Sequence, residues 1–269
     1  MFEIKDLDET RAPLLDHLIE LRTRVIRALL ALGVGFAVCL YFADEILGIL
    51  VRPLKQAFPE GQGQLIFTKL PEVFFVELKV ALFAGFMISF PVIANQLWAF
   101  IAPGLYAREK KAFLPFLIAT PVLFGAGASL AYFVVMPVAF TFFLGFGGMT
   151  GGMNVQALPS AGDYLSLVMQ FILAFGLTFL LPVLLLLLHR AGIVTRDQMV
   201  AARRYVIVVI FIIAAIVTPP DPGSQIILAV PLWLLFEASL FLMRLQEGAV
   251  AADKAAREAE LAAEKAAAE

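Results

Sequence analysis

The sequence has little of what marks a soluble enzyme or a secreted domain. Among 269 residues it contains one cysteine, Cys39, which excludes a disulfide framework. Its two histidines, His17 and His189, are far apart in the sequence, which argues against a metal site, and we expect no cofactor. The net charge of -2 provides no basic surplus for nucleic acid. The H-E-x-x-H, G-x-S-x-G and P-loop motifs are absent, so the sequence does not favour an enzyme.

Apolar residues are instead abundant, at 61% of the chain with a mean hydropathy of +0.91, and they occur in long blocks. Soluble domains are nearer half apolar. A helix of roughly 20 apolar residues crosses the ~30 Å hydrocarbon core of a bilayer. The blocks predict an all-α integral membrane protein with six transmembrane helices, at about 25–43, 73–100, 112–144, 164–188, 205–217 and 225–243.

Lysine and arginine are distributed unequally between the segments that connect these helices. Cytoplasmic segments of membrane proteins carry the excess of basic residues. With the N-terminus inside, the inner segments hold 16 of the 20 basic residues and the outer side holds 4. Both termini are therefore predicted to be cytoplasmic, with inner segments at 1–27, 101–112, 189–204 and 244–269.

Proline and glycine predict several local features. Residues 44–60 are expected to form an amphipathic outer segment that Pro53 kinks. Pro103-Gly104 is expected to break the second helix. The glycine-rich stretch 145–154 is expected to form a flexible outer loop.

The C-terminal part is predicted to contain two short spans and a tail. The fifth helix, 205–217, has only 13 residues, and Thr218-Pro-Pro-Asp-Pro-Gly223 forces a tight reversal after it. From Gln246 the sequence is rich in Ala, Glu, Lys and Arg. We therefore predict a six-helix transmembrane domain at 1–245 and a cytoplasmic polar tail at 246–269, either helical or disordered.

Two carboxylates on the predicted cytoplasmic side are candidates for binding a cation. Glu20 stands four residues before Arg24, a spacing typical of an exposed ion pair, while Arg22 and Arg24 also serve as topology anchors. Glu109 is the only acid in a basic loop, where it is either a solvated charge or a fixed carboxylate for a cationic ligand. A guanidinium ligand would suit that role because it binds carboxylate through two parallel hydrogen bonds. Spacing alone leaves both interpretations open.

Two polar residues lie in the sixth apolar helix. Glu237 is within the helix, where a charge is costly and often functional, but it is near the cytoplasmic end. We expect it to reach the interface or to pair with Arg244 one heptad later. Gln225 begins the same helix on the outer side, where a solvated cap is the ordinary interpretation.

Several stretches of the sequence carry a resemblance to a known family. They are His17-Leu-Ile-Glu-Leu-Arg-Thr-Arg24, Gln96-Leu-Trp-Ala-Phe-Ile-Ala-Pro-Gly-Leu-Tyr106, Arg108-Glu109-Lys110, Ala131-Tyr-Phe-Val-Val-Met-Pro137 and Thr218-Pro-Pro-Asp221 followed by Ser224-Gln225. In this order they resemble TatC, the multi-spanning receptor of the twin-arginine protein translocase. The resemblance covers residues 15 to 244 and not the tail after 246.

The resemblance implies a non-enzymatic receptor in the bacterial cytoplasmic (inner) membrane. Such a receptor binds Arg-Arg signal peptides of folded precursors, recruits the single-span proteins TatA and TatB, and forms a homo-oligomer within the complex. The proton-motive force drives transport. The positions that match the signal-peptide site are Glu20, Glu109, Arg22, Arg24 and Phe100. Those that match the partner-docking region are Gln225, Tyr205 and Thr218.

The same resemblance assigns structural roles and shows one departure. The structural positions are Pro53, Pro91, Pro103, Tyr132 and Asp221. Members of the family often have a glutamate in the middle of the fourth helix, before a proline. Here Leu180 stands at that position, before Pro182, so a role carried by that acid is not expected of this chain.

Three other function classes are alternatives. A secondary transporter or channel needs polar groups near the bilayer midplane and often has inverted repeats. The predicted helices offer few such groups apart from Glu237, and the sequence shows no internal repeat. A membrane-assembly factor that never binds signal peptides is the second alternative, and an intramembrane enzyme ranks last.

Overall fold

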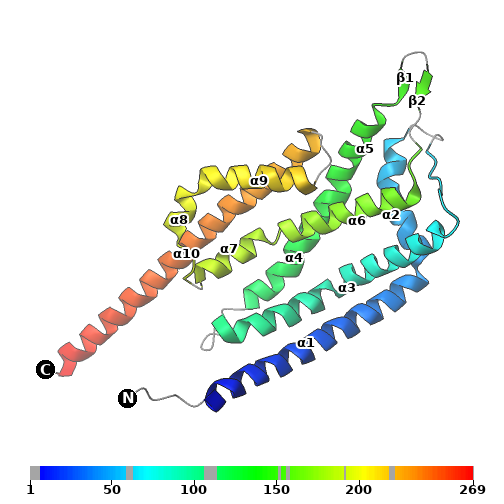
Figure 1. The fold of residues 1–269 in the computed structure, drawn as a ribbon. Helices are drawn as coiled ribbons and strands as arrows, with labels where there is room; N and C mark the ends of the chain where they lie inside the picture. Colours follow the sequence, from blue (N-terminus) through cyan, green and yellow to red (C-terminus); the bar gives the residue numbers. More distant parts are fainter. Residues whose placement is uncertain are drawn as a thin grey trace. The chain divides into compact units, whose positions relative to one another are not determined.

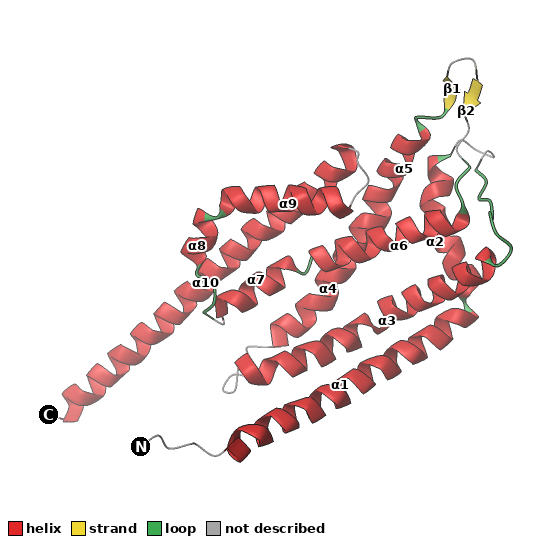
Figure 2. Cartoon of the chain, in the orientation of Figure 1, coloured by secondary structure: helices red, strands yellow, loops and turns green. Residues whose placement is uncertain are grey.

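The structure is a computed structural model of the 269-residue chain and is almost entirely helical (Figures 1 and 2). It describes residues 7–58, 63–105, 114–150, 153–155, 158–190, 192–217 and 222–268. Two compact units divide the chain, Met1–Gly176 and Leu177–Glu269.

The first unit consists mainly of long apolar helices. Its elements are α1 (Leu7–Tyr41), α2 (Ala43–Ala57), α3 (Glu72–Leu105), α4 (Leu114–Leu130), the π-helix η2 (Ala131–Val135), α5 (Met136–Leu144), the strands β1 (Gly148–Thr150) and β2 (Met153–Val155), and α6 (Ala161–Thr178). Helix α2 is the predicted amphipathic segment, with acidic residues in its first turn and Lys55 in its last. These charges complement the helix dipole.

Helix α1 packs along α3, and small residues set their separation (Figure 1). Gly35 and Gly85 face each other so closely that a Cβ on Gly85 would lie 2.6 Å from the backbone nitrogen of Phe36. Beside them the Ser89 hydroxyl donates a hydrogen bond of 2.8 Å to the carbonyl oxygen of Ala31. Small residues at such a crossing let two membrane helices approach closely, and an interhelical hydrogen bond adds to the packing.

The predicted third span is continuous but changes its winding. Helix α4 passes into the π-helix at Ala131–Val135 and then into α5. Pro137 lies two residues after the end of this π-helix. It has no N–H that could donate a hydrogen bond to the carbonyl oxygen of Phe133. The proline ring also clashes with that carbonyl, and a widened turn removes the clash.

Two of the predictions from glycine and proline were wrong. The stretch predicted as a flexible loop contains the antiparallel strands β1 and β2, in which Gly148 pairs with Val155. In the sequence the two strands are separated by Gly151-Gly152, which lie outside the described residues. Helix α3 also does not break at Pro103-Gly104, because it continues to Leu105. Pro103 lies in the last turn of α3, two residues before the helix ends.

The second unit contains α7 (Leu181–Arg190), α8 (Arg196–Ala201), α9 (Arg203–Val217) and α10 (Pro222–Ala268). The predicted fourth span is therefore two helices, α6 and α7. Pro182 explains the interruption, because its ring excludes the carbonyl of Thr178, the last residue of α6. Leu180 lies in this interruption. Helix α8 begins with a capping box, in which Thr195 is the N-cap and Gln198 its partner.

Helix α10 continues without interruption through the predicted tail to Ala268. The predicted boundary between residues 245 and 246 is not marked by a change of secondary structure. The division into a membrane domain and a cytoplasmic tail stays a prediction.

Five helical segments of the described residues are long and apolar enough to cross a membrane. They are His17–Tyr41, Glu72–Phe100, Phe116–Leu144, Ala161–Arg190 and Pro222–Leu245. Helix α9, with 15 residues, is too short to count among them. The helical membrane-protein class is confirmed, and the sixth span stays a prediction.

Candidate functional site

The candidate site begins with Glu20, which lies half-buried on α1. The predicted pair with Arg24 is present: the Arg24 Nε donates to Glu20 Oε1 at 2.9 Å, and Nη2 donates to the same oxygen. Arg22 lies on the same helix and is exposed. One carboxylate oxygen is thus occupied by an internal guanidinium.

The second carboxylate oxygen of Glu20 faces a ring stack. His17 Nδ1 lies 3.8 Å from Glu20 Oε2. The His17 imidazole stacks on the Phe100 ring, with centroids 4.3 Å apart and planes 17° from parallel. Since Phe100 belongs to α3, this stack places the C-terminal part of α3 beside Glu20. The structure therefore brings together Glu20, Arg24 and Phe100 of the predicted signal-peptide residues, and adds His17, which the sequence did not single out for this role.

Three of the predicted site residues, Glu109, Thr218 and Asp221, lie outside the described residues. In the sequence, Glu109 follows Leu105, the last residue of α3, by four positions.

The predicted docking residues that the structure describes belong to the second unit. Gln225 is half-buried near the start of α10, and its Nε2 donates to the carbonyl oxygen of Phe211 on α9 at 3.2 Å. It is therefore more than a solvated cap, since it joins two helices. Tyr205 is exposed on α9, and the Arg204 guanidinium lies 4.8 Å from its ring centre and donates to its hydroxyl at 3.0 Å.

Glu237 does not pair with Arg244 as expected. Its Oε2 accepts a hydrogen bond of 2.7 Å from Nη2 of Arg203, the first residue of α9. The preference for a partner on the same helix was wrong because α9 packs against α10 and brings an arginine closer. The guanidinium of Arg203 thus compensates the charge of Glu237 within the second unit. Glu237 was the main support for the alternative of a transporter or channel, and the ion pair accounts for it without a transport site.

The predicted structural positions have different surroundings. Pro53 is buried within α2, and the Tyr132 hydroxyl donates a hydrogen bond of 2.6 Å to the carbonyl oxygen of Ile49 on the same helix. Pro91 is exposed within α3, and Pro103 lies in the last turn of that helix. Pro53 and Tyr132 thus both help to fix the position of α2 within the first unit.

A polar cluster that the sequence did not reveal surrounds Glu72, the first residue of α3. Its carboxylate accepts hydrogen bonds from the backbone N–H groups of Thr68, Lys69 and Gly162 at 2.7, 3.1 and 2.9 Å. The hydroxyls of Thr68 and Ser160 donate at 2.9 and 2.6 Å. Only an ionised carboxylate can accept at all of these positions. An acid at the start of an apolar helix was the available signal, but Ser160, just before α6, and Gly162, on α6, are about ninety positions away and share no local pattern with it.

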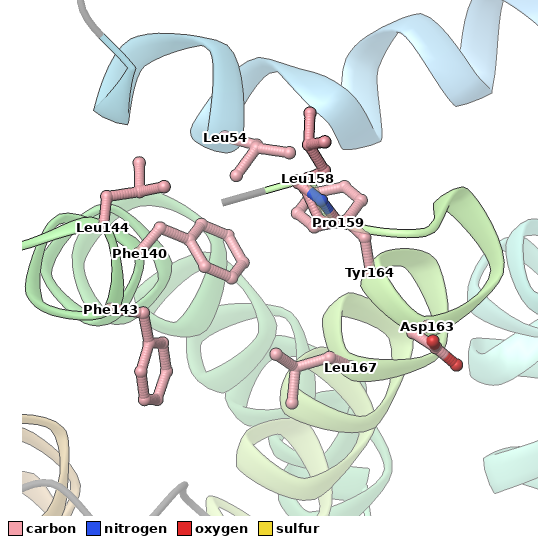
Figure 3. Close-up of a pocket in the computed structure, with 9 residues that line it drawn as sticks. All are labelled: Leu54, Phe140, Phe143, Leu144, Leu158, Pro159, Asp163, Tyr164 and Leu167. Carbon is pink, nitrogen blue, oxygen red and sulfur yellow. The ribbon is translucent and has the colours of Figure 1, made fainter. Parts of the chain in front are cut away.

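The first unit also contains an apolar cavity of about 350 Å³ between α2, α5 and α6 (Figure 3). Leu54 and Phe140 line it, as do the neighbouring apolar side chains labelled in Figure 3. Its two side chains with ionisable groups are Asp163, which is exposed, and Tyr164, whose hydroxyl donates to the carbonyl oxygen of Leu50 at 2.8 Å. This lining offers no pair of reacting groups.

Comparison with known proteins identifies the family. Residues 16–231 match the family described as Sec-independent protein translocase protein (TatC). The TatC of Magnetococcus marinus is 48% identical over 256 residues, which cover 95% of this chain and 93% of that protein. The TatC of Escherichia coli K12 is 38% identical over 240 residues, covering 89% and 91%.

A solved structure agrees with these sequence relatives. It is a crystal structure of the twin-arginine translocase receptor TatC, 41% identical to this chain, with a TM-score of 0.71. The match covers 84% of this chain and 98% of the solved one. The resemblance predicted from the motifs is confirmed: the chain belongs to the TatC family of Sec-independent protein translocases, non-enzymatic transport proteins that cross the bacterial inner membrane several times.

Proposed function

We propose that this chain is the receptor and core subunit of a twin-arginine translocase, and that Glu20 and Glu109 together bind the arginine pair of a signal peptide. The observation that carries the proposal is the state of Glu20. Its Oε1 already holds the guanidinium of Arg24, which demonstrates that the geometry suits an arginine. Both hydrogen bonds that Arg24 donates end on Oε1, and His17 Nδ1 lies 3.8 Å from Oε2, beyond hydrogen-bond distance, so Oε2 can accept a hydrogen bond from a further guanidinium.

The position of α3 supports a site with two carboxylates. The His17–Phe100 stack holds the C-terminal part of α3 against α1, and Glu109 follows that helix by four residues. Two carboxylates on neighbouring segments match two adjacent arginines in charge and in hydrogen-bonding capacity. Arg24 neutralises Glu20 while the site is empty, and an incoming arginine would share or replace it.

The remaining steps of the proposal are those that the resemblance to the family implies. The apolar segment of the signal peptide would lie against or between the helices after its arginines bind. TatB and TatA would then be recruited at the second unit, and several copies of this chain would assemble in the complex. The proton-motive force would drive transport.

Crosslinking tests the receptor function directly. A photoreactive residue at Leu18, which is 59% exposed on the Glu20 segment of α1, is expected to form an adduct with a twin-arginine signal peptide. The matched control is Ile49 on α2, which is 45% exposed and lies outside the Glu20 segment. Adducts from Ile49 but not from Leu18 would place signal-peptide binding elsewhere.

We further propose six spans with both termini inside, which requires α9 to cross the membrane. Its 15 residues reach about 22 Å, less than the ~30 Å core, so a thinned bilayer or a partner helix must accommodate the difference. Gly152→Cys and Gly223→Cys, each in a Cys39→Ala background, are expected to react with an impermeant maleimide from outside the cell. Labelling of Ala107→Cys from outside would instead invert the topology.

Docking of a partner helix near Gln225 is the third part of the proposal. The Nε2 of Gln225 is used within the unit, but its Oε1 remains an acceptor, and the neighbouring outward face of α9 is apolar. A polar residue on a TatA or TatB helix can donate to that oxygen. Because hydrogen bonds between membrane helices average about 0.6 kcal/mol, the site would add specificity to an apolar contact.

Gln225→Leu is therefore expected to weaken partner docking modestly, by about threefold, and to leave signal-peptide binding unchanged. Gln225→Arg, which adds charge and bulk, should have a larger effect. Site-specific crosslinking from α10 to TatA and TatB measures the change, and Ile226→Leu, at an exposed neighbouring position, is the control. Full crosslinking in Gln225→Leu together with efficient crosslinking from α3 would contradict this docking assignment.

A further inference from the structure

A second cavity in the first unit has a different character from the one in Figure 3. It has a volume of about 540 Å³ and is lined by α1, α3 and α6. Three of its lining side chains are polar or charged: Lys79 from α3, and Ser166 and Gln170 from α6. The apolar lining includes Leu32, Phe86 and Leu173. We refer to it as the Lys79 groove.

The polar and apolar side chains are separated along the length of the groove. Helices α3 and α6 begin at the same level, because the Glu72 carboxylate at the start of α3 accepts hydrogen bonds from Ser160 and Gly162 at the start of α6. Lys79 lies about 10 Å along α3 from Glu72, and Phe86 lies about 21 Å along it. On α6, Ser166 and Gln170 likewise precede Leu173. The groove is polar toward the membrane surface at the Glu72 end and apolar toward the bilayer interior.

Lys79 has no anionic partner among the described residues: no carboxylate lies within 4.0 Å of its ammonium group. The nearest acidic residues along α3 do not form an ion pair with Lys79. Glu72 already accepts five hydrogen bonds, and Glu77 is two positions away, which places it on another face of the helix. Side chains of a helix lean toward its N-terminus, so Lys79 extends toward the Glu72 end and the headgroup region.

We propose that the Lys79 groove binds one molecule of an anionic phospholipid. The lipid phosphate accepts hydrogen bonds from Lys79 Nζ, and the Gln170 amide donates to the glycerol ester region. One acyl chain lies along the apolar part, against Leu32, Phe86 and Leu173. A cationic group beside a membrane surface attracts anionic lipid, and van der Waals contacts with the apolar lining hold the acyl chain.

The size of the groove suits a small ligand such as one lipid chain. Its volume of about 540 Å³ lies within the range of about 300–1,000 Å³ that is usual for small-ligand sites.

Native mass spectrometry of the full-length protein with added lipid tests this proposal. The wild type is expected to retain one phosphatidylglycerol molecule at collision energies that remove phosphatidylcholine. Lys79→Gln should lower phosphatidylglycerol retention about tenfold. The matched control is Lys69→Gln, because Lys69 is an exposed lysine near the same end of α3 that does not line the groove. Equal retention of the two lipids by the wild type, or unchanged retention in Lys79→Gln, would overturn the proposal.

A second measurement locates the lipid without changing a charge. Phosphatidylglycerol with a diazirine in its acyl chain should label peptides that contain Met169 and Leu82, two further lining residues. Met169→Trp, which fills the groove, should abolish that labelling while the thermal unfolding temperature stays close to that of wild type. Labelling confined to residues outside the groove, or labelling that persists in a folded Met169→Trp protein, would show that no lipid occupies it.

Discussion

Replacing Glu109 or Glu20 by glutamine is expected to weaken binding of a twin-arginine signal peptide by roughly ten- to hundredfold. Each variant removes one charge-assisted hydrogen-bonding group, and loss of such a bond costs about 1.5–3 kcal/mol. Titration of the purified full-length protein with a labelled signal peptide measures the effect. Both variants should still insert in the membrane, because neither substitution interrupts an apolar helix.

Two comparisons separate this site from a general loss of negative charge. Glu45→Gln removes an exposed acid from the first turn of α2 and should bind the peptide like wild type. A twin-lysine peptide should bind the wild type more weakly than a twin-arginine peptide, since lysine cannot form two parallel bonds to a carboxylate. If Glu109→Gln and Glu20→Gln both bind the twin-arginine peptide with wild-type affinity, the proposed receptor site is wrong.

Gly85→Ala is expected to cause the largest loss of stability among single methyl additions in the first unit. Its new Cβ would lie 2.6 Å from the backbone nitrogen of Phe36 and 2.8 Å from its Cα, and neither backbone atom can rotate away. Helix α1 would have to move away from α3. That movement would also lengthen the hydrogen bond from the Ser89 hydroxyl to the Ala31 carbonyl oxygen. Overpacking of this kind costs about 1–3 kcal/mol and occasionally more.

Thermal unfolding of the detergent-purified protein measures this change. Gly33→Ala is the matched control, because Gly33 lies on α1 only two residues from Gly35, and a methyl group at Gly33 would meet no atom of another helix within 4 Å. Alanine favours helix by about 1 kcal/mol relative to glycine, so Gly33→Ala should be neutral or slightly stabilising. Equal unfolding temperatures for Gly85→Ala and Gly33→Ala would mean that α1 and α3 do not pack as described.

The sequence by itself determined the class of protein and its family. Apolar blocks of about 20 residues have no stable alternative to helices in lipid, since every backbone N–H and C=O must be satisfied within the segment. This is why five of the six predicted spans correspond to long apolar helical segments. The motifs around Glu20, Phe100 and Tyr132 then identified the TatC family, because several motifs in a fixed order are far more specific than hydropathy.

The sequence predicted the ends of helices near prolines less well. The rule that proline ends a helix was wrong for Pro103, because α3 continues beyond it to Leu105. The end of α6 at Thr178 was not predicted, although Pro182 explains it. The cost of a proline depends on whether the carbonyl four residues earlier can be satisfied in another way. That depends on position within the helix and on neighbouring elements, which single-sequence patterns do not contain.

Only the tertiary structure decided which side chains meet. His17 and Phe100, Glu72 and Ser160, and Arg203 and Glu237 are each separated by more than thirty positions, so no helical periodicity relates them. Apolar faces toward lipid and toward protein have the same composition, and hydropathy therefore cannot tell which helices pack together. The packing of α3 on α1 places Phe100 beside Glu20, and the packing of α9 on α10 gives Glu237 its arginine, because those contacts depend on how whole helices associate and not on the residues that flank each side chain.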